Sequence, residues 1–393
     1  MSSLRQALAI TAINLRSIPQ RLGTSLVICV GIAGVVAVLV TVLAMSTGLQ
    51  STIASAGRAD RAVVLRGGAL AEGLSTITRD DLIAIEAAPG IARTPSGRFA
   101  ISPEALLSVN LPRAADGQPS ALSVRGITAV AAAVRPEITL TEGRMFKPGL
   151  HEIVVGKSAH DQFAHMNIGD VAKFYNGDWT VVGRFESHGD VHESEVLTDA
   201  ETLMSAANRT VFSGVTVALE SPQSFDAFKQ ALLQDPTLKV DVQRETEYYE
   251  GQSKGIATLL GIVANTVGAI MAIGALFGAL NTMYSAVSAR TVEIATLRAV
   301  GFGSWPVVVS VLVEAQVLAL AGALIGGAIA WILFNGSTFS TGGSLGQVAL
   351  RLHVGTPLIA LGIVWAAVIG LIGGLFPAIR AARTSVANAL RVV

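Results

Sequence analysis

Four long apolar segments stand out in an otherwise mixed chain of 393 residues. They cover residues 24–47, 255–289, 304–334 and 355–379, and Glu314 is the only charged residue within them. A helix needs about 20 consecutive apolar residues to cross the hydrocarbon core of a bilayer. The pattern therefore predicts a multi-pass membrane protein with four transmembrane helices.

Residues 48–254, between the first two apolar segments, mix polar and apolar positions as a water-exposed domain does. Short β-branched and aromatic runs predict strands, and Thr78 with Asp81 three residues later predicts a capped helix at 78–87. Strands are expected at 61–66, 121–126, 152–156, 171–175, 179–185 and 214–219, and a second helix at 224–234. The fold class is therefore a membrane α-helical protein with a mixed α/β extracytoplasmic domain inserted between helices 1 and 2.

Two further segments of this domain have distinct patterns. Residues 89–118 contain several prolines and glycines and are expected to be rich in loops. Residues 243–254 are polar, with no proline and a single glycine, Gly251. They predict a helical stalk that continues into the second transmembrane helix.

The basic residues favour one orientation in the membrane. Cytoplasmic loops are enriched in Lys and Arg. Arginines precede the first apolar segment, lie between the second and third, and follow the fourth: Arg5, Arg16, Arg21, Arg290, Arg298, Arg380, Arg383 and Arg391. We therefore expect cytoplasmic termini in a cell inner membrane, with an amphipathic helix in residues 1–23, a cytoplasmic segment at 290–303, an outer loop at 335–354 and a tail at 380–393.

Composition narrows the classes of function. Only 14% of the residues are charged and the net charge is zero, so nothing favours binding to nucleic acid. The single cysteine, Cys29, excludes disulfides within the chain. Because it lies in the first apolar segment, we interpret it as a small apolar residue.

The tripeptide Gly156-Lys157-Ser158 resembles the end of a phosphate-binding loop. That motif requires a glycine five residues before Gly156, where His151 stands. The segment is also expected outside the cytoplasm. We therefore predict no nucleotide site in this chain, and no cofactor.

Five of the six histidines fall between His151 and His192. His188, Asp190, His192 and Glu193 are residue types that can hold zinc, but their spacing matches no standard zinc site. We expect surface histidines on a solvated acidic loop, and no metal site.

Glu314 is the most informative single charge. A carboxylate inside a transmembrane helix costs about 2.5 kcal/mol or more unless it is paired or hydrated. It could line a substrate path or couple proton movement. It could also be structural, bonded to a neighbouring helix or to a dimer partner, and the structural interpretation is favoured.

From the second apolar segment onward the sequence becomes specific. Asn281 is followed by Arg-x-x-Glu-Ile-x-x-Leu-Arg-Ala-x-Gly and then by a glutamate and glycines within the third segment. The positions are Arg290, Glu293, Ile294, Leu297, Arg298, Ala299, Gly301, Glu314, Gly322, Gly326 and Gly327. After the fourth segment come Pro377, Ala381 and Ala382, and then Ala389, Leu390 and Arg391. This order resembles the MacB/FtsX-like ABC transporter permease family, the type VII or mechanotransmission transporters.

The resemblance implies a non-catalytic permease subunit that works with two copies of an ABC ATPase, which binds ATP and magnesium. The segment 290–303 would be the coupling helix that docks on the ATPase, through Arg290, Glu293, Ile294, Leu297, Arg298, Ala299 and Gly301. Asn281, Glu314, Gly322 and Gly326 would make structural contacts within the membrane or contacts across a dimer. The permease would form a homodimer, or a heterodimer with a sister permease, in membrane lipid.

For the task itself, the resemblance implies movement of the outer domain that drives efflux, or export or extraction of a substrate from the periplasm or outer leaflet. A periplasmic adaptor and an outer-membrane channel are possible partners. The alternatives are an FtsX-like regulator of periplasmic hydrolases and a membrane sensor or scaffold. A secondary transporter is supported by Glu314 alone, and no internal repeat is visible.

Overall fold

The computed structural model divides into two compact units. The residues that it describes are 3–17, 19, 22–343 and 346–383. The membrane unit consists of Met1–Thr47, Thr258–Ser337 and Leu352–Val393, and the outer unit of Gly48–Ala257 and Thr338–Arg351. The predicted tail positions Ala389, Leu390 and Arg391 lie outside the described residues.

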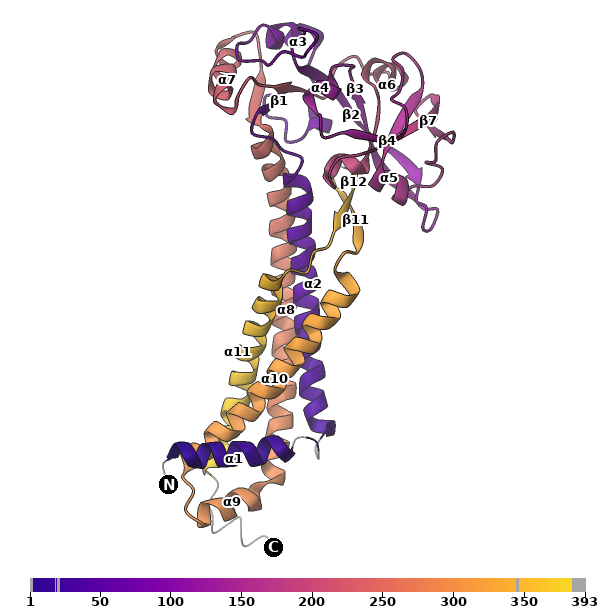
Figure 1. Ribbon diagram of the computed structural model, residues 1–393. Coiled ribbons are helices and arrows are strands. Elements are labelled where there is room, and N and C mark those ends of the chain that lie inside the picture. The colour runs from indigo at the N-terminus through magenta and orange to yellow at the C-terminus, as the bar shows by residue number, and fades with distance from the viewer. Residues whose placement is uncertain (1–2, 18, 20–21, 344–345, 384–393) are drawn as a thin grey trace. The chain divides into compact units, whose positions relative to one another are not determined.

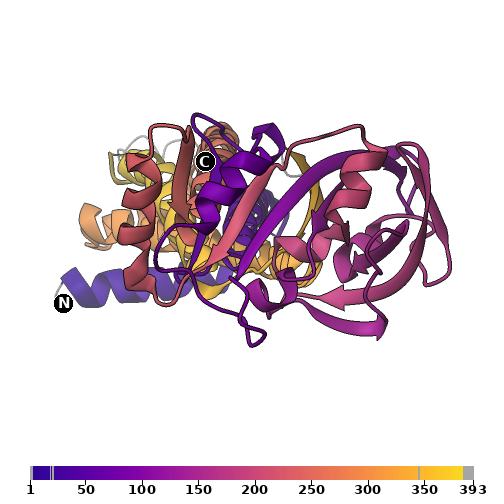
Figure 2. The same ribbon diagram turned by 90° about the horizontal axis from the view of Figure 1, so that it is seen from above.

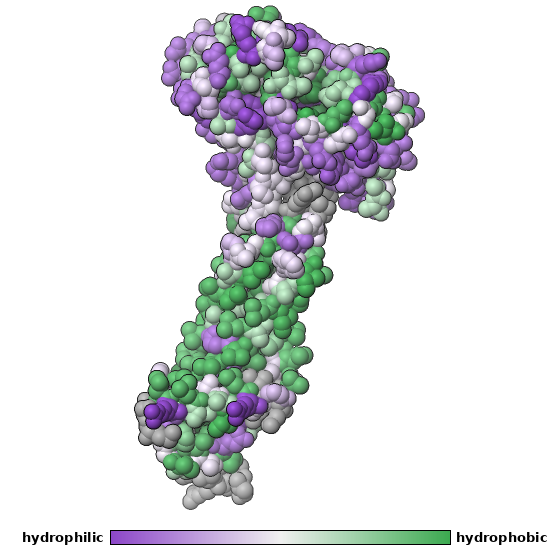
Figure 3. Space-filling view, in the orientation of Figure 1, coloured by the Kyte–Doolittle hydropathy of each residue, from purple (hydrophilic) through white to green (hydrophobic). Residues whose placement is uncertain are grey.

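The membrane unit is helical (Figure 1). Its helices are α1 (Ser3–Ser17), α2 (Leu22–Ala54), α8 (Glu245–Ala289), α9 (Thr291–Ala299), α10 (Ser304–Phe334) and α11 (Thr356–Arg383), where the last turns of α2 and the first turns of α8 belong to the outer unit. Within the described residues, α2, α8, α10 and α11 are long and apolar enough to cross a membrane. The surface of these helices is largely hydrophobic (Figure 3), which agrees with the four predicted transmembrane segments.

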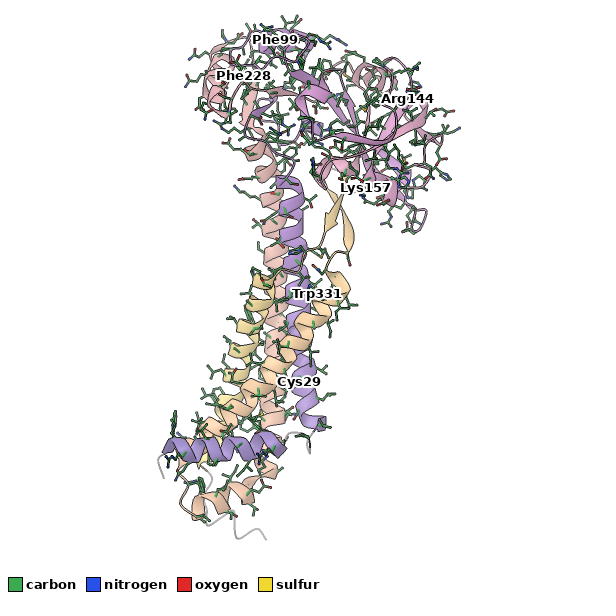
Figure 4. All side chains as sticks on the ribbon, viewed as in Figure 1. Cys29, Phe99, Arg144, Lys157, Phe228 and Trp331 are labelled. Carbon is green, nitrogen blue, oxygen red and sulfur yellow. The ribbon has the colours of Figure 1, made fainter. Side chains whose placement is uncertain are left out.

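Glycines let α10 approach its neighbours closely. A Cβ atom on Gly326 would lie 2.4 Å from the carbonyl oxygen of Ala33 in α2, and one on Gly322 would lie 2.8 Å from that of Cys29. Figure 4 labels Cys29 on α2, where its Sγ donates to the Leu318 carbonyl at 3.4 Å. Small residues at such crossings let helix backbones approach closely. The resulting van der Waals packing drives helix association in lipid, where the hydrophobic effect between helices is absent.

The outer unit is built on a ten-stranded mixed sheet, seen from above in Figure 2. The strand order is β10-β1-β9-β2-β3-β8-β5-β7-β4, with β6 paired to β7. The strands are β1 (Arg61–Arg66), β2 (Ile101–Pro112), β3 (Pro119–Ile127), β4 (Thr139–Gly143), β5 (Glu152–Gly156), β6 (Val171–Phe174), β7 (Gly177–Glu186), β8 (Glu195–Asp199), β9 (Gly214–Ala218) and β10 (Val240–Arg244). The β3–β8 and β5–β7 pairs are parallel and the others are antiparallel.

Short helices complete the outer unit. They are α3 (Arg79–Glu86), α4 (Ala131–Val134), α5 (Lys157–Gln162), α6 (Ala200–Ala206) and α7 (Phe225–Gln234), with 3₁₀ turns η2 (Glu72–Leu74), η3 (Val191–Ser194) and η4 (Pro222–Ser224). Thr78 and Asp81 form the predicted capping box at the start of α3. The core includes Trp179, which is fully buried and stacks on Phe174 with ring centroids 4.9 Å apart.

The prediction that residues 89–118 are rich in loops was wrong for their second half. Strand β2 covers Ile101–Pro112 and pairs with both β9 and β3. Its two prolines misled the prediction, because proline cannot donate to a strand ladder. Here Pro103 lies opposite Val215 near the start of the strand and Pro112 is its last residue, so the central part of β2 keeps all its donors.

Two other segments also differ from the prediction. Gln243 and Arg244 belong to strand β10, and the stalk helix begins at Glu245 and continues to Ala289 as one helix, α8. The expected outer loop at 335–354 contains a hairpin of β11 (Thr338–Gly343) and β12 (Gly346–Arg351), and β12 contacts β3 and η3 of the outer unit.

Candidate functional site

The candidate site is the short helix α9, which connects α8 to α10 at the end of the membrane unit that also carries α1 (Figure 1). Arg290 occupies the corner between α8 and α9, where the backbone leaves helical geometry. The other end of α9 closes at Gly301, with φ of +103°. The Gly301 N–H donates to the Arg298 carbonyl and the Phe302 N–H to the Leu297 carbonyl, both at 3.1 Å. These two backbone hydrogen bonds form a Schellman cap. The cap requires a residue that tolerates positive φ, which Gly301 does.

Arg290 and Glu314 form a buried ion pair that fixes the start of α9 to α10. The Arg290 Nη2 and Nη1 atoms donate to the two carboxylate oxygens of Glu314 at 3.0 and 3.1 Å. Arg290 is 5% exposed and Glu314 is 6% exposed. Glu314 therefore has a structural partner within its own chain.

Helix α1 is fastened to the same part of α10. The Asn14 side-chain amide donates to the Ser310 hydroxyl at 2.6 Å, one turn of α10 before Glu314. On α1, Ile10 is buried against the membrane helices, whereas Leu4 and Leu8 are exposed. Helices α1 and α9 are thus both attached to the same part of α10.

The two faces of α9 differ in exposure. Ile294 is buried and Leu297 packs partly against the core of the membrane unit, so these two residues hold α9 in place. Val300, in contrast, is exposed although it follows Leu297 at helical spacing. The face of α9 that remains accessible consists of Val292, Glu293, Thr296, Ala299 and Val300, and we call it the α9 outer face. Arg298 is half-buried beside this face.

A cavity of about 400 Å³ lies between α1, α9 and the ends of α8 and α10. Its lining is mainly apolar, with Ile13, Met283 and Val307 among the contributors, and polar groups come from Asn14, Arg290, Glu293 and Glu314. Apolar walls with a few polar groups are typical of surfaces that receive another molecule. The cavity shows that α1 contributes to this site, which sequence reasoning missed.

The remaining predicted membrane positions separate into two groups. Gly322 and Gly326 are covered by α2 of the same chain, so they make structural contacts within the unit. Asn281 is exposed on α8 and points away from the unit. Gly274 and Gly278 of α8 have open space above their Cα atoms.

The expectation of a solvated acidic loop at 188–193 was wrong. Asp190, His192 and Glu193 are all buried. Asp190 accepts from the His192 N–H, and Glu193 accepts from the N–H groups of Ser187 and Gly189, so both carboxylates satisfy the backbone of a tight turn. Sequence periodicity carries little information in a turn whose side chains bond to their own backbone. Among the described residues, no three His, Cys, Asp or Glu side chains are grouped so that they could hold a metal ion.

Lys157, labelled in Figure 4, is the first residue of the six-residue helix α5 after β5. Its ammonium group pairs with Glu186 at 2.7 Å. The lysine of the tripeptide 156–158 is therefore engaged in a surface ion pair.

Comparison with known proteins identifies the family. Residues 22–235 match the model of the MacB-like periplasmic core domain, and residues 265–386 match that of the FtsX-like permease C-terminal domain. This chain belongs to the MacB/FtsX-like family of ABC transporter permeases. The permease has its predicted fold class: four membrane helices with an inserted mixed α/β domain.

One curated relative of this permease is described as an uncharacterized ABC transporter permease, MJ1507, of Methanocaldococcus jannaschii. The two are 24% identical over 264 residues, which are 64% of this chain and 65% of the relative. The match therefore spans slightly less than two thirds of that relative's length.

Two solved extracytoplasmic domains also match. The extracellular domain of the ABC-type transporter YknZ from Gram-positive bacteria is 14% identical, covers 47% of this permease and 99% of its own chain, and has a TM-score of 0.36. The periplasmic region of MacB from Actinobacillus actinomycetemcomitans is also 14% identical, covers 54% and 97%, and has a TM-score of 0.37.

Proposed function

We propose that this permease couples ATP hydrolysis by a separate ABC ATPase to movement of its own outer domain. The observation that carries the proposal is the construction of α9. Its start is fixed by the buried Arg290–Glu314 pair and its end by the Gly301 cap, while the α9 outer face stays accessible. A rigid helix with one accessible face is suited to docking in a groove of a partner.

In this proposal the seven family-motif residues have different tasks. Arg290, Ile294, Leu297 and Gly301 position α9, whereas Glu293 and Ala299 contact the ATPase and Arg298 lies at the edge of that contact. The α1 side of the cavity completes the docking surface. The permease itself is non-catalytic, and ATP and magnesium bind to the two ATPase copies.

We place the permease in the cell inner membrane with both termini in the cytoplasm. Arginines at the α1–α9 end support this orientation. The interior of the membrane unit supports transmission of movement over conduction, because Glu314 is the only acidic residue in the four membrane segments and Arg290 neutralises it. The task is then efflux, or export or extraction of a substrate from the periplasm or outer leaflet, with a periplasmic adaptor and outer-membrane channel as further partners.

A second permease chain, identical or a sister, is proposed to pack on α8. Gly274, Gly278 and Asn281 lie within about 60° of one another around the helix, at 100° per residue. Glycines four residues apart permit close helix contact, and an asparagine in the membrane gains a hydrogen bond across it. These residues face away from their own unit, so the contact is open to another chain.

The test is docking of the ATPase. Val300 is 76% exposed on the α9 outer face, and Val300→Asp should weaken copurification of the ATPase at least about tenfold by placing a charge in an apolar contact. Ile83→Asp is the matched control, because Ile83 is a 67% exposed aliphatic residue on α3 of the outer unit. The proposal fails if no ABC ATPase accompanies the unmodified permease from mild detergent, or if both variants retain it equally.

A further inference from the structure

A cluster of buried charges lies in the outer unit where α8 begins. It consists of Arg61, Arg125 and Arg135 with Glu72, Glu104, Glu195 and Glu245, and none is more than 4% exposed. These residues come from β1, β3, the turn after α4, η2, β2, β8 and the first residue of α8. The cluster therefore joins the stalk helix to several elements of the sheet.

Glu245 connects the cluster to both helices that lead to the membrane. One of its carboxylate oxygens lies 2.6 Å from the Arg61 Nε atom and accepts from the Arg58 N–H at 3.1 Å, four residues beyond the end of α2. The other oxygen accepts from the Arg135 Nη1 atom at 2.7 Å. Both oxygens of the first residue of α8 are thus held by arginines or backbone of the outer unit.

Arg135 extends the connection to η3. Its Nη1 atom also donates to His192 Nε2 at 3.0 Å, and its Nη2 atom donates to the Thr216 hydroxyl of β9 at 3.2 Å. Because His192 Nε2 accepts, Nδ1 carries the proton and donates to Glu195 at 3.1 Å. The Tyr249 hydroxyl of α8 lies 3.3 Å from the same Nε2 atom.

Arg125 joins the three carboxylates of the cluster that do not belong to α8. It holds Glu195 of β8 with two bonds of 2.7 and 2.8 Å, and it donates to Glu72 and Glu104 at 2.6 Å each. A continuous series of charge-assisted hydrogen bonds therefore runs from Glu245 through Arg135 and His192 to β8. Bonds of this type are directional and short, so they fix relative orientation.

Stability alone does not explain this arrangement. Buried ion pairs contribute little net stability compared with apolar packing of the same volume, whereas removal of one partner leaves an uncompensated charge. An apolar contact at the base of α8 would allow the helix to rotate or slide over the sheet. The charged contact permits one arrangement, because each arginine must meet specific carboxylates.

A second connection reaches the same place. Strand β12 of the hairpin between α10 and α11 contacts η3 and β3. The turn η3 is therefore contacted by the α10–α11 connection, while its His192 bonds to the α8 cluster.

We propose that the buried cluster is the joint through which α8 sets the orientation of the outer domain, with Glu245, Arg135 and His192 as positioning residues. This inference rests on the proposed function, in which nucleotide binding to the ATPase moves α8. The cluster then transfers that movement to η3 and β8 and prevents the stalk from turning independently of the domain.

Hydrogen–deuterium exchange of the full permease–ATPase complex in nanodiscs tests the joint. Exchange is compared without nucleotide and with magnesium, ATP and vanadate, in peptides covering 245–257 and 187–199. The unmodified complex should show nucleotide-dependent changes of about twofold or more in exchange rate in both segments. In Glu245→Gln the change in 245–257 should remain and the change in 187–199 should be lost. If Glu245→Gln retains the nucleotide-dependent change in 187–199, the proposal that the cluster acts as the joint is wrong.

Glu152→Gln is the matched control. It breaks a bidentate pair with Arg144 (labelled in Figure 4) at 2.6 Å on the outer unit, away from α8, and should keep both nucleotide responses. If Glu245→Gln fails to fold, Arg135→Lys replaces it, with the same expected loss in 187–199 and the same overturning result. A response of the unmodified complex in 245–257 alone contradicts the joint and leaves the proposed function intact. A response in neither segment contradicts both.

Discussion

Arg290 and Glu314 meet in a bidentate pair, with bonds of 3.0 and 3.1 Å, at the point where α9 leaves the membrane helices. The pair joins a residue of the family motif at the α8–α9 corner to a carboxylate inside α10. A charge that appears isolated in a hydrophobic segment is thereby neutralised by the arginine that begins α9. Glu314 of α10 and the first turn of α9 are therefore held together by one ion pair.

Removing one partner of this pair should cost more than removing both. Arg290→Met leaves Glu314 buried without a counter-charge, and we expect a loss of about 3–5 kcal/mol. The double variant Arg290→Met, Glu314→Leu should recover part of that loss. Thermal unfolding of the four forms, including Glu314→Leu alone, measures the coupling as a double-mutant cycle. Additive effects of the two single changes would show that the pair is not formed.

The crossing of α10 and α2 predicts a strong effect of one methyl group. Gly326→Ala would place a Cβ atom 2.4 Å from the Ala33 carbonyl oxygen, so the helices must separate. We expect about 1–3 kcal/mol of destabilisation from this overpacking. Gly34→Ala is the control, because a Cβ atom at Gly34 meets nothing within 4 Å. Equal unfolding temperatures for the two variants would contradict the crossing.

The exposed stripe of α8 predicts how permease chains associate. Gly278→Leu should obstruct close approach of a second chain, and Asn281→Ala should remove a hydrogen bond across the contact, worth about 1 kcal/mol. Gly261→Leu serves as the control, because Gly261 also has open space above it and lies about 140° from Gly274 around the helix. Cross-linking in membranes should fall for the first two variants only. An equal decrease for Gly261→Leu would exclude the stripe as the contact.

Much of the fold could be predicted because its signals are local. The four apolar segments and the Thr78 capping box depend on residues within one or a few turns. The strand β8 was missed, because Glu195 within it looks like a surface charge and only Arg125 of β3 and His192 explain its burial. Pairing between distant segments leaves no periodic pattern in the sequence.

The sequence predicted a short helix between the second and third membrane segments, but not how that helix is oriented. The family motif located α9, yet nothing in the sequence distinguishes Ile294, which is buried, from Val300, which is exposed. That distinction depends on how α9 is oriented by Arg290 and α10. The buried cluster at Glu245 left one usable signal, a lone arginine, Arg125, in an apolar strand.

The buried cluster also predicts how the outer domain responds to acid. Burial alone would raise the pKa of Glu104, but Arg135 and Arg125 outweigh it and hold that pKa below its ordinary value of 4.5. The pKa of Glu195 is lowered in the same way, against burial, chiefly by Arg125. Groups with lowered folded-state pKa values contribute stability that is complete above the unfolded value and is lost as pH falls toward the folded value. Burial raises the pKa of Asp190, which acts in the opposite direction.

We therefore expect the free energy of unfolding of the outer domain to fall as pH decreases below about 4.5. In that range Glu104 and Glu195 bind protons in the unfolded chain but stay ionised in the folded domain. Hydrogen exchange in β3 and β8, measured during thermal unfolding of the permease at several pH values below and above 4.5, gives the slope of the unfolding free energy against pH. Glu195→Gln should lower stability at neutral pH and flatten the slope, since the variant has one fewer carboxylate to protonate. An unchanged slope in that variant would show that Glu195 is not ionised within the cluster.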